Sequence, residues 1–147
     1  TYAELAKHPN IVAIKEANGD IASVAHTRAL CGDDLAIYSG NDDQIVPILS
    51  LGGAGVISVL SNVCPKETHD ICQLYFDGKV KESSDLQIKY MELIAALFSD
   101  VNPIPVKQAL NEMGFAAGPC RLPLCDMSDS GKQHLREVMR RYGLING

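Results

Sequence analysis

The sequence predicts an α/β fold in which three parallel strands form the C-terminal part of a larger barrel. Apolar runs at 11–17, 35–39 and 56–60 are each followed by a helical segment. They recur at roughly 20 to 24 residues, which is the rhythm of parallel βα units. From residue 79 onward only helices are expected. Because a free three-stranded parallel sheet would expose two long apolar edges, this unit requires more strands on both sides.

Hydrophobic periodicity and turn residues give the individual elements. In chain order they are a helix at 2–7, a strand at 11–17, a helix at 21–31, a strand at 35–39, a helix at 45–51, a strand at 56–60, and helices at 66–76, 80–98, 106–113 and 130–142. His8-Pro9-Asn10 ends the first helix, and Asp20 can cap the second. Proline-containing segments at 102–105 and 118–123 separate the last three helices, and 128–131 can cap the final one.

The change in pattern near residue 79 predicts two domains. Residues 1–78 form a partial barrel of three βα units, and residues 79–147 form a C-terminal helical domain. With 147 residues and 46% hydrophobic side chains, the chain can bury a core. It begins at Thr1 with a segment typical of the end of a helix, so we expect it to be a piece of a longer protein.

Composition excludes several classes of function. The net charge is −5 and no basic cluster exists, so neither nucleic acid nor a membrane surface is an expected partner. The longest apolar runs, such as 93–98, are far too short to span a bilayer. Five cysteines and four histidines follow no metal-ligand spacing. We expect reduced, mostly buried cysteines in a cytoplasmic protein that has no metal site.

Lys15 lies near the end of an otherwise apolar strand and is the first candidate for chemistry. The two-residue period places it on one face with Ala13, while Ile14 and Glu16 lie on the other. A strand that is apolar on both faces indicates a sheet covered on both sides, which would direct Lys15 into packed protein. Burial disfavours the ammonium form, and a neutral amine is a nucleophile toward carbonyl carbon. The alternative, a lysine whose ammonium reaches solvent, stays open for this stretch alone.

Other motifs admit both structural and functional interpretations. Glycines at 52–55 follow a helix and precede a strand, which favours a tight turn over a phosphate loop. Ser39-Gly40-Asn41-Asp42 lies at the carboxyl end of a strand, where active sites of βα folds gather, although Asp42 or Asp43 could instead cap the next helix. Ile57 is a core residue by default, with any ligand role passing through its backbone. The prolines at 102–107 favour a structural connection.

Five motifs occur together in a specific order. They are Ile14-Lys15-Glu16-Ala17-x-Gly19-Asp20, Ser39-Gly40-x-Asp42, Gly52-Gly53-x-Gly55-Val56-Ile57-Ser58-Val59, Asn102-Pro103-Ile104-Pro105-Val106-Lys107 and Arg121-Leu122-Pro123-Leu124. Over essentially all 147 residues the chain resembles the C-terminal half of the 4-hydroxy-tetrahydrodipicolinate synthases (dihydrodipicolinate synthases), which are pyruvate-dependent class I aldolases. Asn41 stands where many members have aspartate.

The resemblance implies a TIM (β/α)8 barrel with a C-terminal helical extension, assembled as a homotetramer. This chain would supply strands 6 to 8 and the extension. Lys15 would form a Schiff base with pyruvate, and the enamine would attack L-aspartate 4-semialdehyde in lysine and diaminopimelate biosynthesis. The backbone around Ile57 would border the pyruvate, and Gly40 would line the same pocket. The resemblance implies neither a metal nor another cofactor.

The resemblance also implies what this chain lacks. The family's proton-relay tyrosines and threonine, its carboxylate-binding arginine and its lysine feedback site belong to the N-terminal half, and Tyr38 matches none of them. The isolated chain is therefore expected to be inactive, with the N-terminal half of the barrel or further copies as partners.

N-acetylneuraminate and keto-deoxy-sugar-acid lyases share the lysine, although the residues after it usually differ from Glu16-Ala17. A non-catalytic oligomerisation module, with residues 88–98 at subunit contacts, is the alternative from another class.

Overall fold

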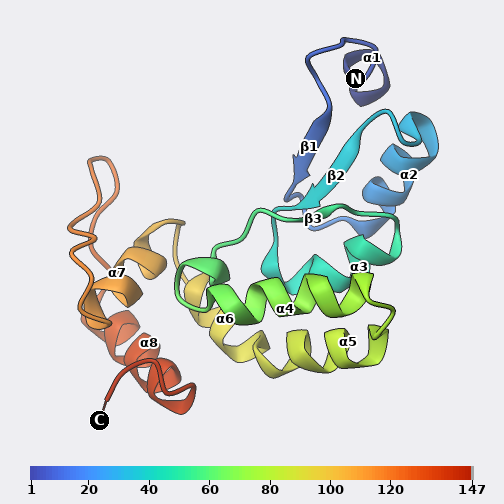
Figure 1. Cartoon of the computed structure of the whole chain (residues 1–147). Helices are drawn as coiled ribbons and strands as arrows, with labels where there is room; N and C mark the ends of the chain where they lie inside the picture. Colours follow the sequence, from blue (N-terminus) through green and yellow to red (C-terminus); the bar gives the residue numbers. More distant parts are fainter. Residues whose placement is uncertain (147) are drawn as a thin grey trace. The chain divides into compact units, whose positions relative to one another are not determined.

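Three short strands form a parallel sheet in the computed structural model, which describes residues 1–146 (Figure 1). Strands β1 (Ala13–Glu16), β2 (Ala36–Ser39) and β3 (Gly55–Val56) lie in the order β1-β2-β3. The register pairs Lys15 with Tyr38 and Tyr38 with Gly55. The prediction of three parallel strands is confirmed. The third strand is shorter than predicted, because β2, with which it pairs, ends at Ser39 and the ladder ends there too.

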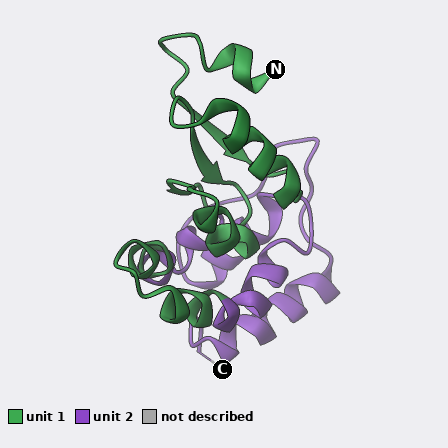
Figure 2. Ribbon diagram, turned by 90° about the vertical axis from the view of Figure 1, so that its right-hand side faces the viewer, with its two compact units in different colours: residues 1–58, 69–87 green, residues 59–68, 88–147 purple. Residues whose placement is uncertain are grey.

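The chain divides into two compact units (Figure 2). The first comprises residues 1–58 and 69–87 and contains the whole sheet; the second comprises residues 59–68 and 88–147. Each unit is built from two separate segments of the chain, because residues that are distant in the sequence pack together. The predicted division between residues 78 and 79 differs from them and stays a prediction.

One face of the sheet carries the first hydrophobic core. Ile37 of β2 packs with Val24 and Ile48, and each of these side chains is at most 1% exposed. Val24 belongs to α2 (Ile21–Cys31) and Ile48 to α3 (Ile45–Ser50). As predicted, Asp20 caps α2, accepting hydrogen bonds from the backbone nitrogens of the second and third helical residues. The helices therefore cover a single face of the sheet.

The glycines after α3 form a tight turn, as predicted. The backbone nitrogen of Gly53 donates to the carbonyl oxygen of Ile48 at 2.9 Å, and Gly52 has a φ of 84°. A Cβ at Gly53 would lie 2.7 Å from that same oxygen. A side chain at this position would collide with backbone, so the turn requires glycine here.

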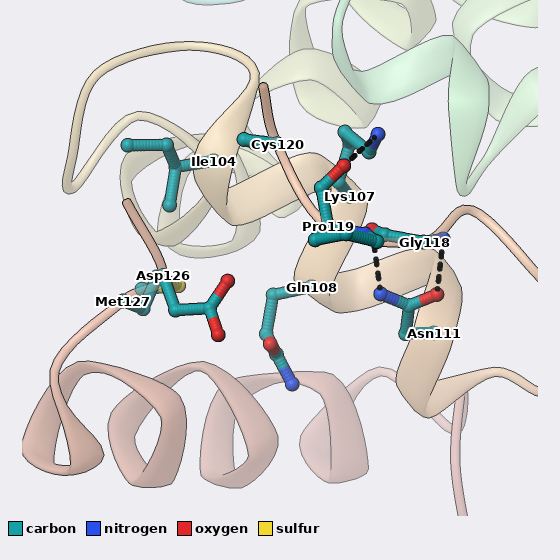
Figure 3. Close-up of a pocket in the computed structure, with 9 residues that line it drawn as sticks. All are labelled: Ile104, Lys107, Gln108, Asn111, Gly118, Pro119, Cys120, Asp126 and Met127. Atoms are coloured by element: carbon teal, nitrogen blue, oxygen red, sulfur yellow. Dashed lines mark hydrogen bonds between the residues drawn. The ribbon is translucent and has the colours of Figure 1, made fainter. Parts of the chain in front are cut away.

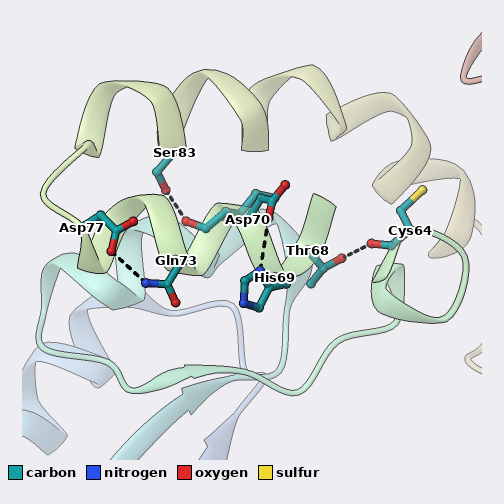
Figure 4. A network of polar contacts seen from close by, with 8 residues as sticks. Cys64, Thr68, His69, Asp70, Gln73, Asp77 and Ser83 are labelled. Atoms are coloured by element: carbon teal, nitrogen blue, oxygen red, sulfur yellow. Dashed lines mark hydrogen bonds and ion pairs between the residues drawn. The ribbon is translucent and has the colours of Figure 1, made fainter. Parts of the chain in front are cut away.

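A second core of the first unit lies around α4 (Pro65–Phe76). Ile71 packs against Ile45 and Leu49, and all three are almost completely buried. Ser83 of α5 (Val80–Lys89) donates a 2.6 Å hydrogen bond to the carbonyl oxygen of Ile71 (Figure 4). Gln87 accepts from the backbone nitrogen of Val46 at 2.8 Å and donates to the carbonyl oxygen of Asp43 at 2.9 Å. These buried polar side chains join α5 to its neighbours and satisfy the three backbone groups that they contact.

The single helix predicted over 80–98 is wrong, because the chain forms two helices there. α5 ends at Lys89, and α6 (Met91–Leu97) begins after Tyr90. The hydroxyl of Tyr142 donates to the carbonyl oxygen of Lys89 at 2.7 Å, and the rings of Tyr90 and Tyr142 lie 5.3 Å apart. A distant side chain thus supplies the partner for this carbonyl, which the sequence pattern of the helix does not reveal.

The second unit is helical. Besides α6 it contains the 3-10 turn η2 (Leu60–Asn62) and the helices α7 (Ile104–Glu112) and α8 (Asp129–Arg141). Leu93, Leu97 and Leu135 are fully buried. Arg136 of α8 donates to Glu112 of α7 at 2.7 Å, and this hydrogen bond lowers the pKa of the Glu112 carboxyl. None of the helices within residues 1–146 is both long and apolar enough to cross a bilayer.

Candidate active site

The uncovered face of the sheet carries the candidate site. Lys15, Tyr38 and Gly55 form one row across the three strands, and register partners in parallel strands share a face. The opposite face, with Ile14 and Ile37, packs on the helices. The amine-bearing residue thus lies near the carboxyl end of its strand, which is the end at which active sites of βα barrels are found.

The three predicted site residues come together at this end of the sheet. A Cβ built on Gly40 would lie 2.9 Å from Cε of Lys15, so the two residues are in direct contact. The backbone nitrogen of Ile57 donates to the carbonyl oxygen of Ser39 at 2.8 Å, which places Ile57 beside the end of β2. The Ile57 side chain is 48% exposed, so the expectation that it belongs to the core is wrong for this chain.

Lys15 is exposed, and the prediction that it points into packed protein is wrong for this chain. The strand was expected to be covered on both faces, but within residues 1–146 helices cover only the face opposite Lys15. Ala13, which shares the face of Lys15, is exposed too. Apolar strand residues that remain in water are typical of a surface that requires a covering layer. The amine-bearing residue lies on the strand as predicted, but it is not shielded from water.

Glu16, the residue after the lysine, fixes the chain that follows β1, a role that the sequence analysis missed. Its side chain is 7% exposed and accepts hydrogen bonds from the backbone nitrogen of Asn18 at 3.0 Å and from the hydroxyl of Tyr2 at 3.3 Å. The negative charge of Glu16 raises the pKa of the Tyr2 phenol. Asn18 in turn accepts from the backbone nitrogen of Asp20 at 2.7 Å. A carboxylate on the covered face of a strand was the available signal.

Ser39 fixes the chain that follows β2, as Glu16 does after β1. Ser39 was included in a motif in the sequence analysis but was not singled out. It is completely buried, and its Oγ donates to the carbonyl oxygen of Asn41 at 2.7 Å. Asp42 and Asp43 lie in the first turn of η1 (Asp42–Gln44), and Asp42 is completely buried. The capping interpretation of these aspartates is not supported, because the N-cap of η1 is Asn41 and that of α3 is Gln44.

The second unit contains a cavity of about 260 Å³ that holds none of the predicted site residues (Figure 3). Lys107 donates to the carbonyl oxygen of Pro119 at 2.8 Å. Asn111 donates to the carbonyl oxygen of Gly118 and accepts from its nitrogen, at 3.2 and 3.1 Å. These side chains fasten the segment after α7, which agrees with the structural interpretation of residues 102–107.

The cysteines are free, and they differ in exposure. Cys31 and Cys64 are buried, Cys72 and Cys120 are partly buried, and Cys125 is exposed. No three His, Cys, Asp or Glu side chains gather as a metal-binding group in the part of the chain that the structure describes. Burial and the nearby charge of Glu67 raise the pKa of the Cys64 thiol to about 11.

Alkylation should separate these thiols. At pH 8 a thiol of pKa about 11 is ionised in about one molecule in a thousand, and the thiolate is the reactive form. With iodoacetamide and peptide mass spectrometry we expect Cys125 to react first and Cys64 last, with Cys64 labelling rising steeply between pH 8 and about 11. Urea-unfolded chain is the control, in which Cys64 and Cys125 should react alike. Equal rates in the folded chain would contradict the assigned burial.

Comparisons with known proteins agree on one family. The model of the dihydrodipicolinate synthetase family matches residues 1–142. A 4-hydroxy-tetrahydrodipicolinate synthase of Clostridium perfringens (strain SM101 / Type A) is 61% identical over 142 residues, which is 97% of this chain and 49% of the relative. The corresponding protein of Caldicellulosiruptor saccharolyticus is 54% identical over 144 residues, 98% of this chain and 48% of the relative.

Solved structures give the same result. The crystal structure of dihydrodipicolinate synthase from Thermotoga maritima has a TM-score of 0.93 at 43% identity, covering 98% of this chain and 50% of that one. A structure of the enzyme from Aquifex aeolicus has a TM-score of 0.91 at 32% identity, covering 97% of this chain and 49% of that one. The chain therefore spans about half the length of the relatives that it matches.

Proposed function

The chain belongs to the dihydrodipicolinate synthetase family, and from this premise we propose that it is the Schiff-base half of a pyruvate-condensing lyase. The reaction joins pyruvate to L-aspartate 4-semialdehyde and gives 4-hydroxy-tetrahydrodipicolinate for lysine and diaminopimelate biosynthesis. The observation that supports this best is the position of Lys15, at the carboxyl end of β1 and in contact with Gly40.

Lys15 would be the catalytic nucleophile. Its neutral amine attacks the keto carbon of pyruvate, and loss of water leaves a protonated imine. The positive nitrogen withdraws electrons, so a methyl proton is lost and an enamine forms. The enamine carbon then attacks the aldehyde carbon of the semialdehyde, whose oxygen takes up a proton. The amino group of the semialdehyde adds to the imine carbon and displaces the amine of Lys15, which closes the ring of the product. The backbone at Gly40 and Ile57 would border the pyruvate in this pocket.

The exposed face explains why the chain alone should be inactive. Lys15 lies in water in this chain, without the covering layer that a closed barrel would supply. The family resemblance assigns the groups that move protons to the N-terminal half, and such groups typically contribute about 10²–10⁴-fold. We therefore propose that strands from an N-terminal half complete a (β/α)8 barrel over Lys15. The assembled enzyme would be a cytoplasmic homo-oligomer.

A fusion protein tests this proposal. The N-terminal half of the Clostridium perfringens relative, which is 61% identical over the shared region, is joined in frame before residue 1. Borohydride reduction in the presence of pyruvate should then label Lys15, and the fusion should condense pyruvate with aspartate semialdehyde. The 147-residue chain alone serves as the control and should show no condensation.

Three results would contradict the proposed function. The first is a folded, closed fusion without label on Lys15. The second is cleavage of N-acetylneuraminate or a keto-deoxy-sugar acid without condensation of the semialdehyde. The third is a well-folded monomeric chain whose sedimentation does not change in the presence of a separately expressed N-terminal half, because the open face would then need no covering strands.

A further inference from the structure

The backbone conformation of Gly40 does not explain why this residue is a glycine. Eight glycines of residues 1–146 have a positive φ, which disfavours side chains, and Gly40 is not among them. The φ of Gly40 therefore does not by itself require glycine. The absence of a side chain must then be required by the space around it.

The space beside Gly40 is filled by two side chains from the end of β1. A Cβ on Gly40 would lie 2.6 Å from Cβ of Ala17, 2.9 Å from Cε of Lys15 and 3.1 Å from Cγ of Lys15. Contacts under 3.0 Å essentially never occur for a real Cβ. The aliphatic part of Lys15 thus passes directly over the α-carbon of Gly40.

The backbone at Gly40 is held and cannot withdraw from this contact. Its nitrogen donates to the carbonyl oxygen of Glu16 at 2.7 Å. On the other side, the completely buried Ser39 accepts from the nitrogen of Asn41 at 3.3 Å and donates to its carbonyl oxygen at 2.7 Å. A methyl group at position 40 would therefore displace Lys15, which is flexible, or push against Ala17, which is not.

We propose that Gly40 is a positioning residue that directs the amine of Lys15 to the carboxyl end of the sheet. Its missing side chain leaves the space that the lysine methylenes occupy, so Lys15 can adopt the rotamer that passes over residue 40. This inference rests on the proposed role of Lys15 as the Schiff-base nucleophile. The inference gives a steric reason for the position of the Lys15 amine. This reason is separate from any contact between Gly40 and pyruvate.

Two variants separate displacement of Lys15 from damage to the fold. Gly40→Ala introduces both collisions. Gly40→Ala combined with Ala17→Gly removes the rigid 2.6 Å contact and keeps the contacts with Lys15. Ala17→Gly alone is the matched control, because it changes the same turn without adding an atom near the lysine.

The first measurement uses the full 147-residue chain and needs no activity. NMR should show a nuclear Overhauser effect between the ε-methylene protons of Lys15 and the α-protons of Gly40 in the unsubstituted chain and in Ala17→Gly. In the double variant the Overhauser effect between Lys15 and residue 40 should be lost, or replaced by effects between Lys15 and other residues. The backbone spectrum should stay that of a folded chain. An absent effect in the folded, unsubstituted chain would overturn the inference.

The second measurement uses the fusion described above and compares kcat with KM. A displacement of about 1 Å can cost about 100-fold in rate, so the double variant should lose about that factor in kcat, with a smaller change in KM for pyruvate. A kcat equal to that of Ala17→Gly would overturn the inference. If the Overhauser effect is present but Lys15 is never labelled by pyruvate in the unsubstituted fusion, the proposed function fails and the placement of Lys15 by Gly40 remains.

Discussion

Replacing Lys15 by alanine in the fused barrel abolishes pyruvate labelling at this position and lowers the rate of condensation by about 10³-fold or more. The reason is that Lys15 supplies the amine near the carboxyl end of β1. Steady-state condensation of pyruvate with aspartate semialdehyde gives the rate. Borohydride reduction followed by peptide mass spectrometry gives the labelled position.

Two further variants make the Lys15 result specific. Lys15→Arg keeps a positive charge but offers no amine that can form an imine, so it should be as inactive as Lys15→Ala. Lys79→Ala removes an exposed lysine that lies just after α4, and activity should stay that of the parent fusion. Condensation that survives in Lys15→Ala, or a pyruvate label on another lysine, would show that the nucleophile has been assigned wrongly.

Replacing Ile48 by alanine should destabilise the chain by about 2–5 kcal/mol, the range for truncating a fully buried large aliphatic side chain. Ile48 is 0% exposed, contacts Val24 and Ile37, and lies against the turn at Gly53. The cavity left behind would remove support from the face opposite Lys15. Urea unfolding followed by circular dichroism measures the change in the free energy of unfolding.

Ile88→Ala is the matched control for this prediction. It deletes the same atoms from a side chain that is 67% exposed in α5, so its effect should stay within about 0.5 kcal/mol. Similar losses in both variants would mean that Ile48 is not part of a core in solution. A loss in Ile88→Ala alone would instead point to a contact made by that exposed surface.

Local signals were sufficient for most elements of the fold. Asp20 and the Gly52-Gly53 turn act through neighbours within a few residues, so their hydrogen bonds are encoded in the sequence around them. The break at Tyr90 could not be predicted, because Tyr142, 52 positions later, supplies the competing donor. Periodicity describes which residues can share a face, but it does not show which distant side chain will bind a backbone carbonyl.

The sequence by itself determined the strand position of Lys15, the parallel βα order and the family, because these depend on side-chain types at fixed local spacings. Only the tertiary structure decided that the Lys15 face is open to water and that Gly40 lies under the lysine methylenes. Both facts depend on which surfaces meet in space. An apolar strand sequence indicates that another layer can cover the strand. It does not show which residues form that layer.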